Sequence, residues 1–229
     1  MVDERQLTRV RELRSQGCTP KQVARALGVA TAEADRLVRQ VAREDAGLAP
    51  EPAVVGSWVS AGWSVGLSAP ADWPDTPTPG GVGNGLVSIA VARAHRHGKV
   101  SVSGYLVDVY CLGVKDVLGP KVLDDFELRG FVRTFFAAYD VPPLPAPIDM
   151  ARELVWGAVA YANVLGFEPH PDFGRTAGHL GGGHPTGAIT FGREGKPYFV
   201  QGVRDKPAHV LATLERSVGE GNFHFLVAV

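Results

Sequence analysis

Residues 104–116 form the densest run of β-forming side chains in the chain, Gly-Tyr-Leu-Val-Asp-Val-Tyr-Cys-Leu-Gly-Val-Lys-Asp. Valine, tyrosine and leucine favour extended, half-buried backbone, so the first part of this run predicts a core strand. Apolar residues also alternate along residues 86–94, and a short turn at 95–99 separates the two runs. Because Gly98 supplies the positive φ that a tight turn needs, this spacing predicts an antiparallel hairpin.

Residues 54–229 together predict one α+β domain with a mostly antiparallel sheet. Strand and helix patterns cluster along this stretch instead of alternating strictly, which argues against a doubly wound parallel fold. The sequence Leu118-Gly-Pro120 is interpreted as a stop that ends the strand region. We expect helices at 122–139, 148–165 and 206–218, a hairpin between 188–191 and 198–201, and a closing strand at 223–229.

Residues 1–45 have the periodicity of three short helices, at about 4–16, 19–27 and 31–44. Thr19 is positioned to cap the second helix, and Gly28 provides a tight turn before the third. Residues 46–53 contain two prolines and no periodicity, so we expect them to form a linker to the larger domain.

The segment Gly17-Cys-Thr-Pro-Lys-Gln-Val-Ala-Arg-Ala-Leu-Gly-Val-Ala30 resembles the helix-turn-helix of homeodomain-like and sigma-factor-type proteins. In such folds the third helix enters the major groove of double-stranded DNA. Glu33 and Asp35 depart from the pattern, because carboxylates at this end of the helix repel phosphates. The resemblance implies that DNA would be contacted by exposed polar side chains of this helix, namely Arg36, Arg39, Gln40 and Arg43.

The charge distribution gives only weak support to DNA binding. The whole chain has a net charge of −1, while residues 1–45 hold nine basic and seven acidic residues, a net charge of +2. A unit with so little excess positive charge makes few phosphate contacts. Protein contact through the three helices is therefore the competing interpretation.

Two sets of residues in the larger domain suggest chemistry. Cys111 with His170 and either Asp172 or Asp108 has the residue types of a nucleophile, a base and an orienting acid. A second set, with residue types that bind metal ions, comprises His170, Asp172, His179 and His184. The spacing matches no metal signature, and no cofactor motif is present, so we expect neither a metal nor a cofactor.

Other features leave alternatives open. Asp108, Lys115 and Asp116 are interpreted as an ion pair that fixes the end of the core strand, with a polar site as the rival. The helix at 122–139 has an aromatic face that suits core packing or an apolar ligand pocket. The proline-rich loops at 68–85 and 141–147 suit protein contact or rigid connection.

Four strings, at 104–108, 111–116, 167–173 and 191–198, together resemble a group of uncharacterised bacterial proteins, and this resemblance implies no activity. The two cysteines lie far apart in the chain, and no apolar run is long enough to span a bilayer. We therefore expect a cytoplasmic bacterial protein that does not engage a membrane.

The leading interpretation is a DNA-associated regulator whose α+β domain binds a ligand or partner, and it favours a protein without enzymatic activity. A hydrolase or nuclease that uses the His/Asp or Cys/His residues is the first alternative. A non-catalytic protein-interaction module is the second.

Overall fold

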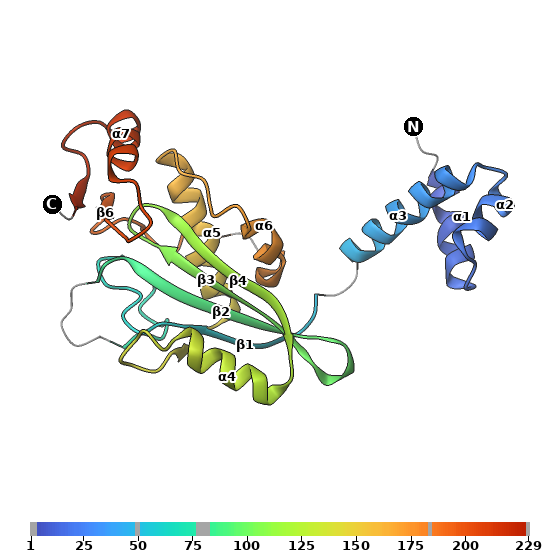
Figure 1. Ribbon diagram of the computed structural model, residues 1–229, viewed down its shortest axis with the longest axis horizontal. Helices are drawn as coiled ribbons and strands as arrows, with labels where there is room; N and C mark the ends of the chain where they lie inside the picture. The colour runs from blue at the N-terminus through green and yellow to red at the C-terminus, as the bar shows by residue number, and fades with distance from the viewer. Residues whose placement is uncertain (1–3, 49–50, 77–82, 183–184, 228–229) are drawn as a thin grey trace. The chain divides into compact units, whose positions relative to one another are not determined.

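The computed structural model describes residues 4–48, 51–76, 83–182 and 185–227, and it describes the side chains of these residues except 4 and 42–48. The chain divides into two compact units, Met1–Glu51 and Pro52–Val229. The fold is mixed α+β, as predicted (Figure 1). Within the described ranges, no helix is long and apolar enough to cross a membrane.

The first unit contains the three predicted helices, α1 (Glu4–Ser15), α2 (Pro20–Leu27) and α3 (Thr31–Leu48). Helix α3 continues into the predicted linker, because no proline interrupts the chain before residue 50. One small apolar cluster holds the helices together, and its buried members are Leu7, Val10, Leu13, Val23, Ala24, Ala34, Leu37 and Val41.

The second unit is built on a five-stranded antiparallel sheet in the order β4-β3-β2-β1-β5. The predicted hairpin is confirmed, since Ala94 pairs with Val100 across the short 3-10 turn η1 (Arg96–Gly98). The strands are β1 (Val54–Val59), β2 (Leu86–Ala94), β3 (Val100–Asp108), β4 (Gly113–Leu123) and β5 (Leu144–Pro145).

The edge strand β4 corrects the prediction that the strand region stops at Pro120. Gly119 and Pro120 lie inside β4, at a register shift between the paired residues Leu118 and Lys121. A proline is tolerated there because an edge strand needs fewer ladder hydrogen bonds than a central one, and a bulge relieves the remaining mismatch. The following helix, α4 (Asp125–Phe135), therefore begins later than predicted, at a capping box formed by Asp124 and Glu127.

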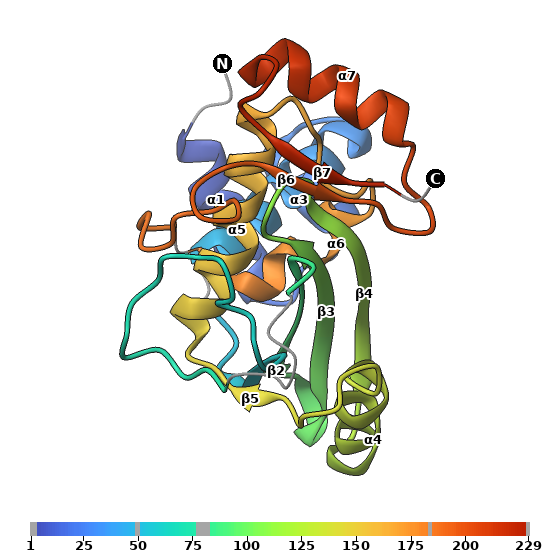
Figure 2. The ribbon, with the colours of Figure 1, turned by 90° about the vertical axis from the view of Figure 1, so that its left-hand side faces the viewer.

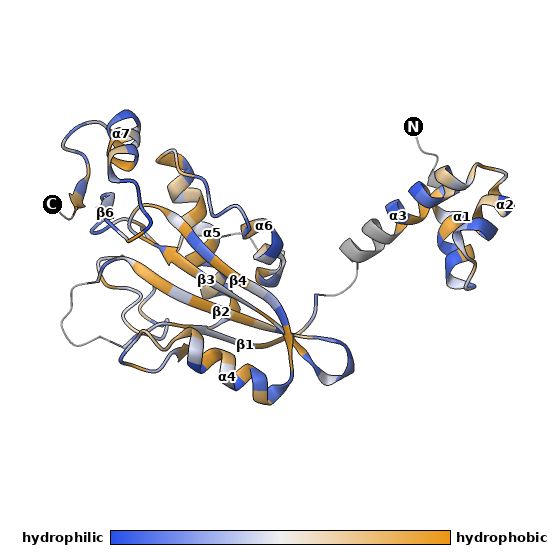
Figure 3. Ribbon diagram, viewed as in Figure 1, coloured by the Kyte–Doolittle hydropathy of each residue, from blue (hydrophilic) through white to orange (hydrophobic). Residues whose placement is uncertain are grey.

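The two faces of the sheet are covered by different helices. The long helix α5 (Ile148–Val164) packs on one face with the short helices α6 (Phe173–Thr176) and η2 (Ala177–Leu180), around a core that includes Ile89, Tyr105 and Leu154. Helix α4 lies on the other face, over Ala92 and Val102 (Figure 1). Strand β2 is almost continuously hydrophobic because it is buried on both faces (Figure 3).

The C-terminal part forms a separate small layer at one end of the sheet (Figure 2). Strands β6 (Tyr198–Val200) and β7 (His224–Leu226) pair in parallel, and α7 (Pro207–Val218) connects them. The predicted hairpin between 188–191 and 198–201 is wrong, since Thr190 instead makes an isolated bridge to Ser68. Local alternation does not show which distant strand pairs with β6, so the sequence favoured the nearest one.

Candidate functional site

The α2–α3 segment owes its shape to capping at both ends of α2. The Thr19 backbone N–H donates to Gln22 Oε1 at 2.7 Å, and the Gln22 N–H donates to Thr19 Oγ1 at 3.4 Å. Gly28 ends the helix with a φ of 67°, a conformation in which a side chain would be strained. Val29 then packs against the apolar cluster of the first unit. The turn between α2 and α3 is thereby fixed at each end.

Helix α3 presents part of its predicted DNA-contacting set to solvent. Arg36 and Arg39 are exposed, and Gln40 is half-buried. Arg36 Nη2 lies 3.9 Å from Glu33 Oε1, so one predicted phosphate contact already faces a carboxylate of the same helix. The side chain of Arg43 is outside the described part of the chain.

The predicted nucleophile and its predicted base occupy different environments. Cys111 is fully buried among Leu165, Phe199 and Leu214, and this burial raises the pKa of its thiol well above the usual range. His170 and Asp172 remain together, since the Asp172 N–H donates to His170 Nδ1 at 3.2 Å. A thiol that keeps its proton in an apolar cluster is a poor nucleophile.

The predicted metal ligands are also divided. His170 donates its backbone N–H to Val114, at the start of β4. His179 Nε2 lies 2.9 Å from Ser101 Oγ, at the start of β3 and thus at the other end of the β3–β4 pair. Burial lowers the pKa of His179. His184 lies outside the described residues, and no group of three or more potential metal ligands occurs among those described.

The end of β3 contains a buried carboxylate that sequence reasoning assigned to an ion pair. Asp108 is 3% exposed, and its Oδ1 accepts the backbone N–H groups of Tyr110 at 2.9 Å and Cys111 at 3.0 Å. Burial raises the pKa of this carboxyl to about 7. Lys115 instead pairs with Asp205, with 2.6 Å between Nζ and Oδ2. Asp108 thus caps the β3–β4 turn, and Lys115 ties β4 to the segment before α7.

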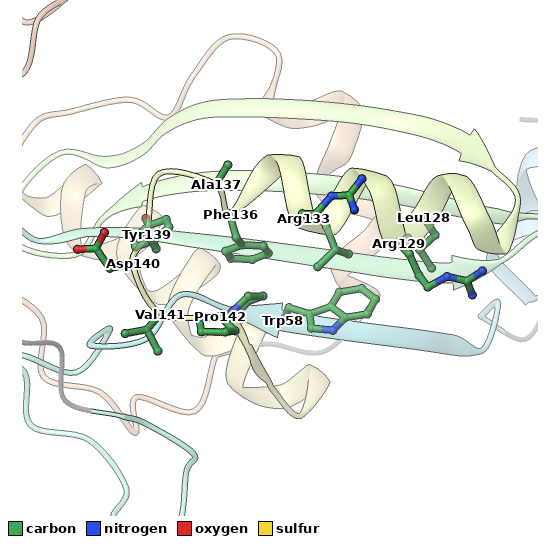
Figure 4. A pocket seen from close by; sticks show the side chains of 12 residues that line it. Trp58, Leu128, Arg129, Arg133, Phe136, Ala137, Tyr139, Asp140, Val141 and Pro142 are labelled. Atoms are coloured by element: carbon green, nitrogen blue, oxygen red, sulfur yellow. The ribbon is translucent and has the colours of Figure 1, made fainter.

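A cavity of about 580 Å³ lies between α4 and β1, and it is called the α4 cavity below (Figure 4). Its volume falls in the range that small-molecule sites occupy. Trp58 and Phe136 lie at its centre, and the turn after α4 closes one end (Figure 4). The apolar lining residues are Trp58, Leu128, Val132, Phe136, Ala137, Val141, Pro142 and Pro143.

Three charged side chains also line the α4 cavity. Arg129 lies at one end and Asp140 at the other, with Trp58 and Phe136 between them (Figure 4). Arg133 is one helical turn after Arg129 on α4. Neither arginine has an ion-pair or hydrogen-bond partner among the described residues. The cavity therefore combines an apolar centre with a cation, Arg129, at one end.

The backbone of β1 shapes the floor of the α4 cavity. Gly56 and Trp58 lie on the same face of the sheet, paired with Ala92 and Ala90 of β2. A Cβ at residue 56 would lie 2.3 Å from the Trp58 ring, so only glycine lets the indole occupy this place. The Tyr139 hydroxyl donates to Ser88 Oγ at 3.0 Å and anchors the turn after α4.

The sequence alone identified only the α4 side of this cavity. The aromatic face of residues 122–139 raised the choice between core packing and an apolar ligand pocket. Phe136 is buried and also lines the α4 cavity, while Phe126 is 78% exposed and lies outside that lining. Trp58 was missed as a lining residue because it is far from α4 in the amino-acid sequence. The only local signal for a charged ligand was the pair of arginines four residues apart beside these aromatic rings.

Comparison of the chain with protein-family models, with curated proteins and with solved structures found no match.

Proposed function

We propose that this protein is a DNA-associated regulator, in which α2 and α3 form a helix-turn-helix and the larger unit binds a ligand. The carrying observation is the capped α2, followed by the left-handed Gly28 and by an α3 with Arg36 and Arg39 exposed. A rigid turn between two helices is what holds a recognition helix against the major groove.

The charge of the first unit determines how such binding would behave. Residues 1–45 have a net charge of only +2, and Glu33 is close to Arg36. Phosphate attraction is therefore small, and we expect weak binding to random sequence that falls steeply with salt. Specific affinity would depend on contacts with base edges from the exposed side of α3.

Fluorescence anisotropy of a labelled random duplex tests this proposal with the full chain, at 50 mM and 200 mM salt. Replacing Arg39 and Arg43 by alanine removes two cations from α3. We expect the double variant to bind all duplexes more weakly and to lose roughly two units of the salt-dependence slope.

The matched control removes two cations from the larger unit by replacing Arg96 and Lys99, which are exposed at the β2–β3 turn. We expect its DNA binding to equal that of the unmodified chain. Absence of binding at 50 mM salt, or an equal loss in both double variants, would contradict the proposal. Either result would make α1–α3 a protein-contact element.

A further inference from the structure

We infer that the α4 cavity binds a small amphipathic monoanion, an apolar chain or ring that carries one carboxylate. The cavity is lined mainly by apolar side chains, with Trp58 and Phe136 at its centre. Pockets of this kind obtain affinity from apolar burial and specificity from a few charged groups. The inference concerns the larger unit alone and does not depend on DNA binding by the first.

Arg129 of α4 selects the charge of the ligand. Arg129 and Arg133 both line the cavity and have no partner among the described residues. The two acidic residues of α4 are Asp125 and Glu127. Asp125 forms no ion pair with Arg129 among the described residues, and Glu127 accepts the backbone N–H of Asp124 at 2.9 Å in the capping box. Figure 4 shows the Arg133 side chain on the side of α4 away from Trp58, so Arg129 is the cation placed to meet a carboxylate at the end of the cavity.

Asp140 restricts the ligand to a single negative charge. It lies at the end of the cavity opposite Arg129, with the aromatic rings between them (Figure 4). A carboxylate there repels a second anionic group on the far end of a ligand. The arrangement thus favours a molecule with one anionic end and one neutral, apolar end.

The cavity is held open by the fold around it. Gly56 lets the Trp58 indole lie close against β1, and the hydrogen bond from Tyr139 to Ser88 fixes the turn that closes one end. Phe136 is 3% exposed and contacts Phe135 and Tyr139 edge-on or tilted. Because the fold's own side chains make these contacts, binding requires little reorganisation of the cavity.

Isothermal titration calorimetry of the full chain without DNA tests the charge preference with three probes that share one apolar chain. Octanoate is anionic, octan-1-ol is neutral and octyltrimethylammonium is cationic. We expect octanoate to bind about tenfold more tightly than octanol and the cation to bind least. Replacing both Arg129 and Arg133 by glutamine should reduce octanoate affinity about five- to tenfold and leave octanol affinity unchanged.

The control Arg96→Gln removes an exposed arginine at the β2–β3 turn and should leave octanoate affinity unchanged. A second measurement locates the ligand independently of any arginine variant. The chain has four tryptophans. In ¹H–¹⁵N spectra, the signal of the Trp58 indole N–H is identified by its loss in the Trp58→Phe variant. Octanoate should shift this signal much more than the indole N–H signals of the other three tryptophans.

Several results would overturn the inference. Equal affinity for octanoate and octyltrimethylammonium would remove the role of Arg129. A shift of the Trp156 indole signal in place of the Trp58 signal would place the ligand on the face of the sheet that α5 covers. Saturable binding of an acidic amphipathic peptide without binding of octanoate would make the cavity a protein interface. A chain that binds octanoate but no DNA would keep this inference and remove the proposed function.

Discussion

At the residue scale, the buried carboxylate of Asp108 has the clearest energetic consequence. It is 3% exposed and faces two backbone N–H groups, yet burial raises its pKa to about 7 from an ordinary value of about 3.9. An ion pair was expected here because the sequence places Lys115 nearby. The lysine turns instead to Asp205, a residue 90 positions later that no local pattern could identify.

Asp108→Asn should therefore change how stability depends on pH. Between about pH 4 and pH 7 the folded chain keeps the Asp108 proton while the unfolded chain has lost it, so this residue destabilises the fold as pH rises through that window. Asparagine keeps the accepting Oδ1 and has no charge to bury. We expect the variant to gain on the order of 3 kcal/mol over the unmodified chain between pH 4 and pH 8.

The measurement is urea unfolding of both chains across that pH range. Asp72→Asn, at an exposed loop position, serves as the control and should follow the unmodified chain at every pH. A constant difference between Asp108→Asn and the unmodified chain would show that the carboxyl is already ionised in the folded state at low pH.

At the element scale, prediction from sequence succeeded where a pattern was long and local. Helices α5 and α7 have sustained helical periodicity, and the β2–β3 hairpin combines alternation with a glycine turn. Strand β4 was missed because its glycine and proline are stop signals everywhere except at an irregular sheet edge. The pairing of β6 with β7 and the contribution of Trp58 to the α4 cavity depend on long-range contacts, which leave no local signature.

The packing of α4 on the sheet depends on Gly104. A Cβ at this residue would lie 2.6 Å from the Phe135 ring, so Gly104→Ala should push the ring outward and destabilise the chain by about 1–2 kcal/mol. Phe135→Leu removes the obstructing ring atoms. We therefore expect Gly104→Ala to cost less in the Phe135→Leu background, by about 1 kcal/mol in a double-mutant cycle measured by urea unfolding.

Gly130→Ala is the matched control, because a Cβ on that glycine of α4 meets no atom within 4 Å. It should stabilise the helix slightly, since alanine favours helical backbone more than glycine does. Strict additivity of Gly104→Ala and Phe135→Leu would show that the Phe135 ring does not rest on Gly104.

At the scale of the whole molecule, the chain consists of two units with separate cores. Val10 is buried in the three-helix cluster, and Val91 is buried in the core of the sheet. A unit of its size is expected to bury less surface per residue than the large one, so the first unit should be the less stable of the two. The stability of the first unit can therefore be changed without changing that of the second.

Calorimetric unfolding of the full chain tests this separation with two matched substitutions. Val10→Ala should lower only the free energy of unfolding of the first unit, by about 1–3 kcal/mol. Val91→Ala should lower only the free energy of unfolding of the second unit. A shift of both transitions by either substitution would mean that the two units unfold cooperatively.

The two edges of the sheet differ in how they would meet another chain at high concentration. The register shifts and Pro120 of β4 break the regular row of hydrogen-bonding groups that an incoming strand needs. On the opposite edge, β5 pairs with only Trp58 and Val59 of β1, and the exposed side chains of Val54 and Val55 precede them. Aggregation by strand addition is therefore expected to start at the exposed residues of β1. A high concentration of the protein should favour strand pairing at this edge before the β4 edge.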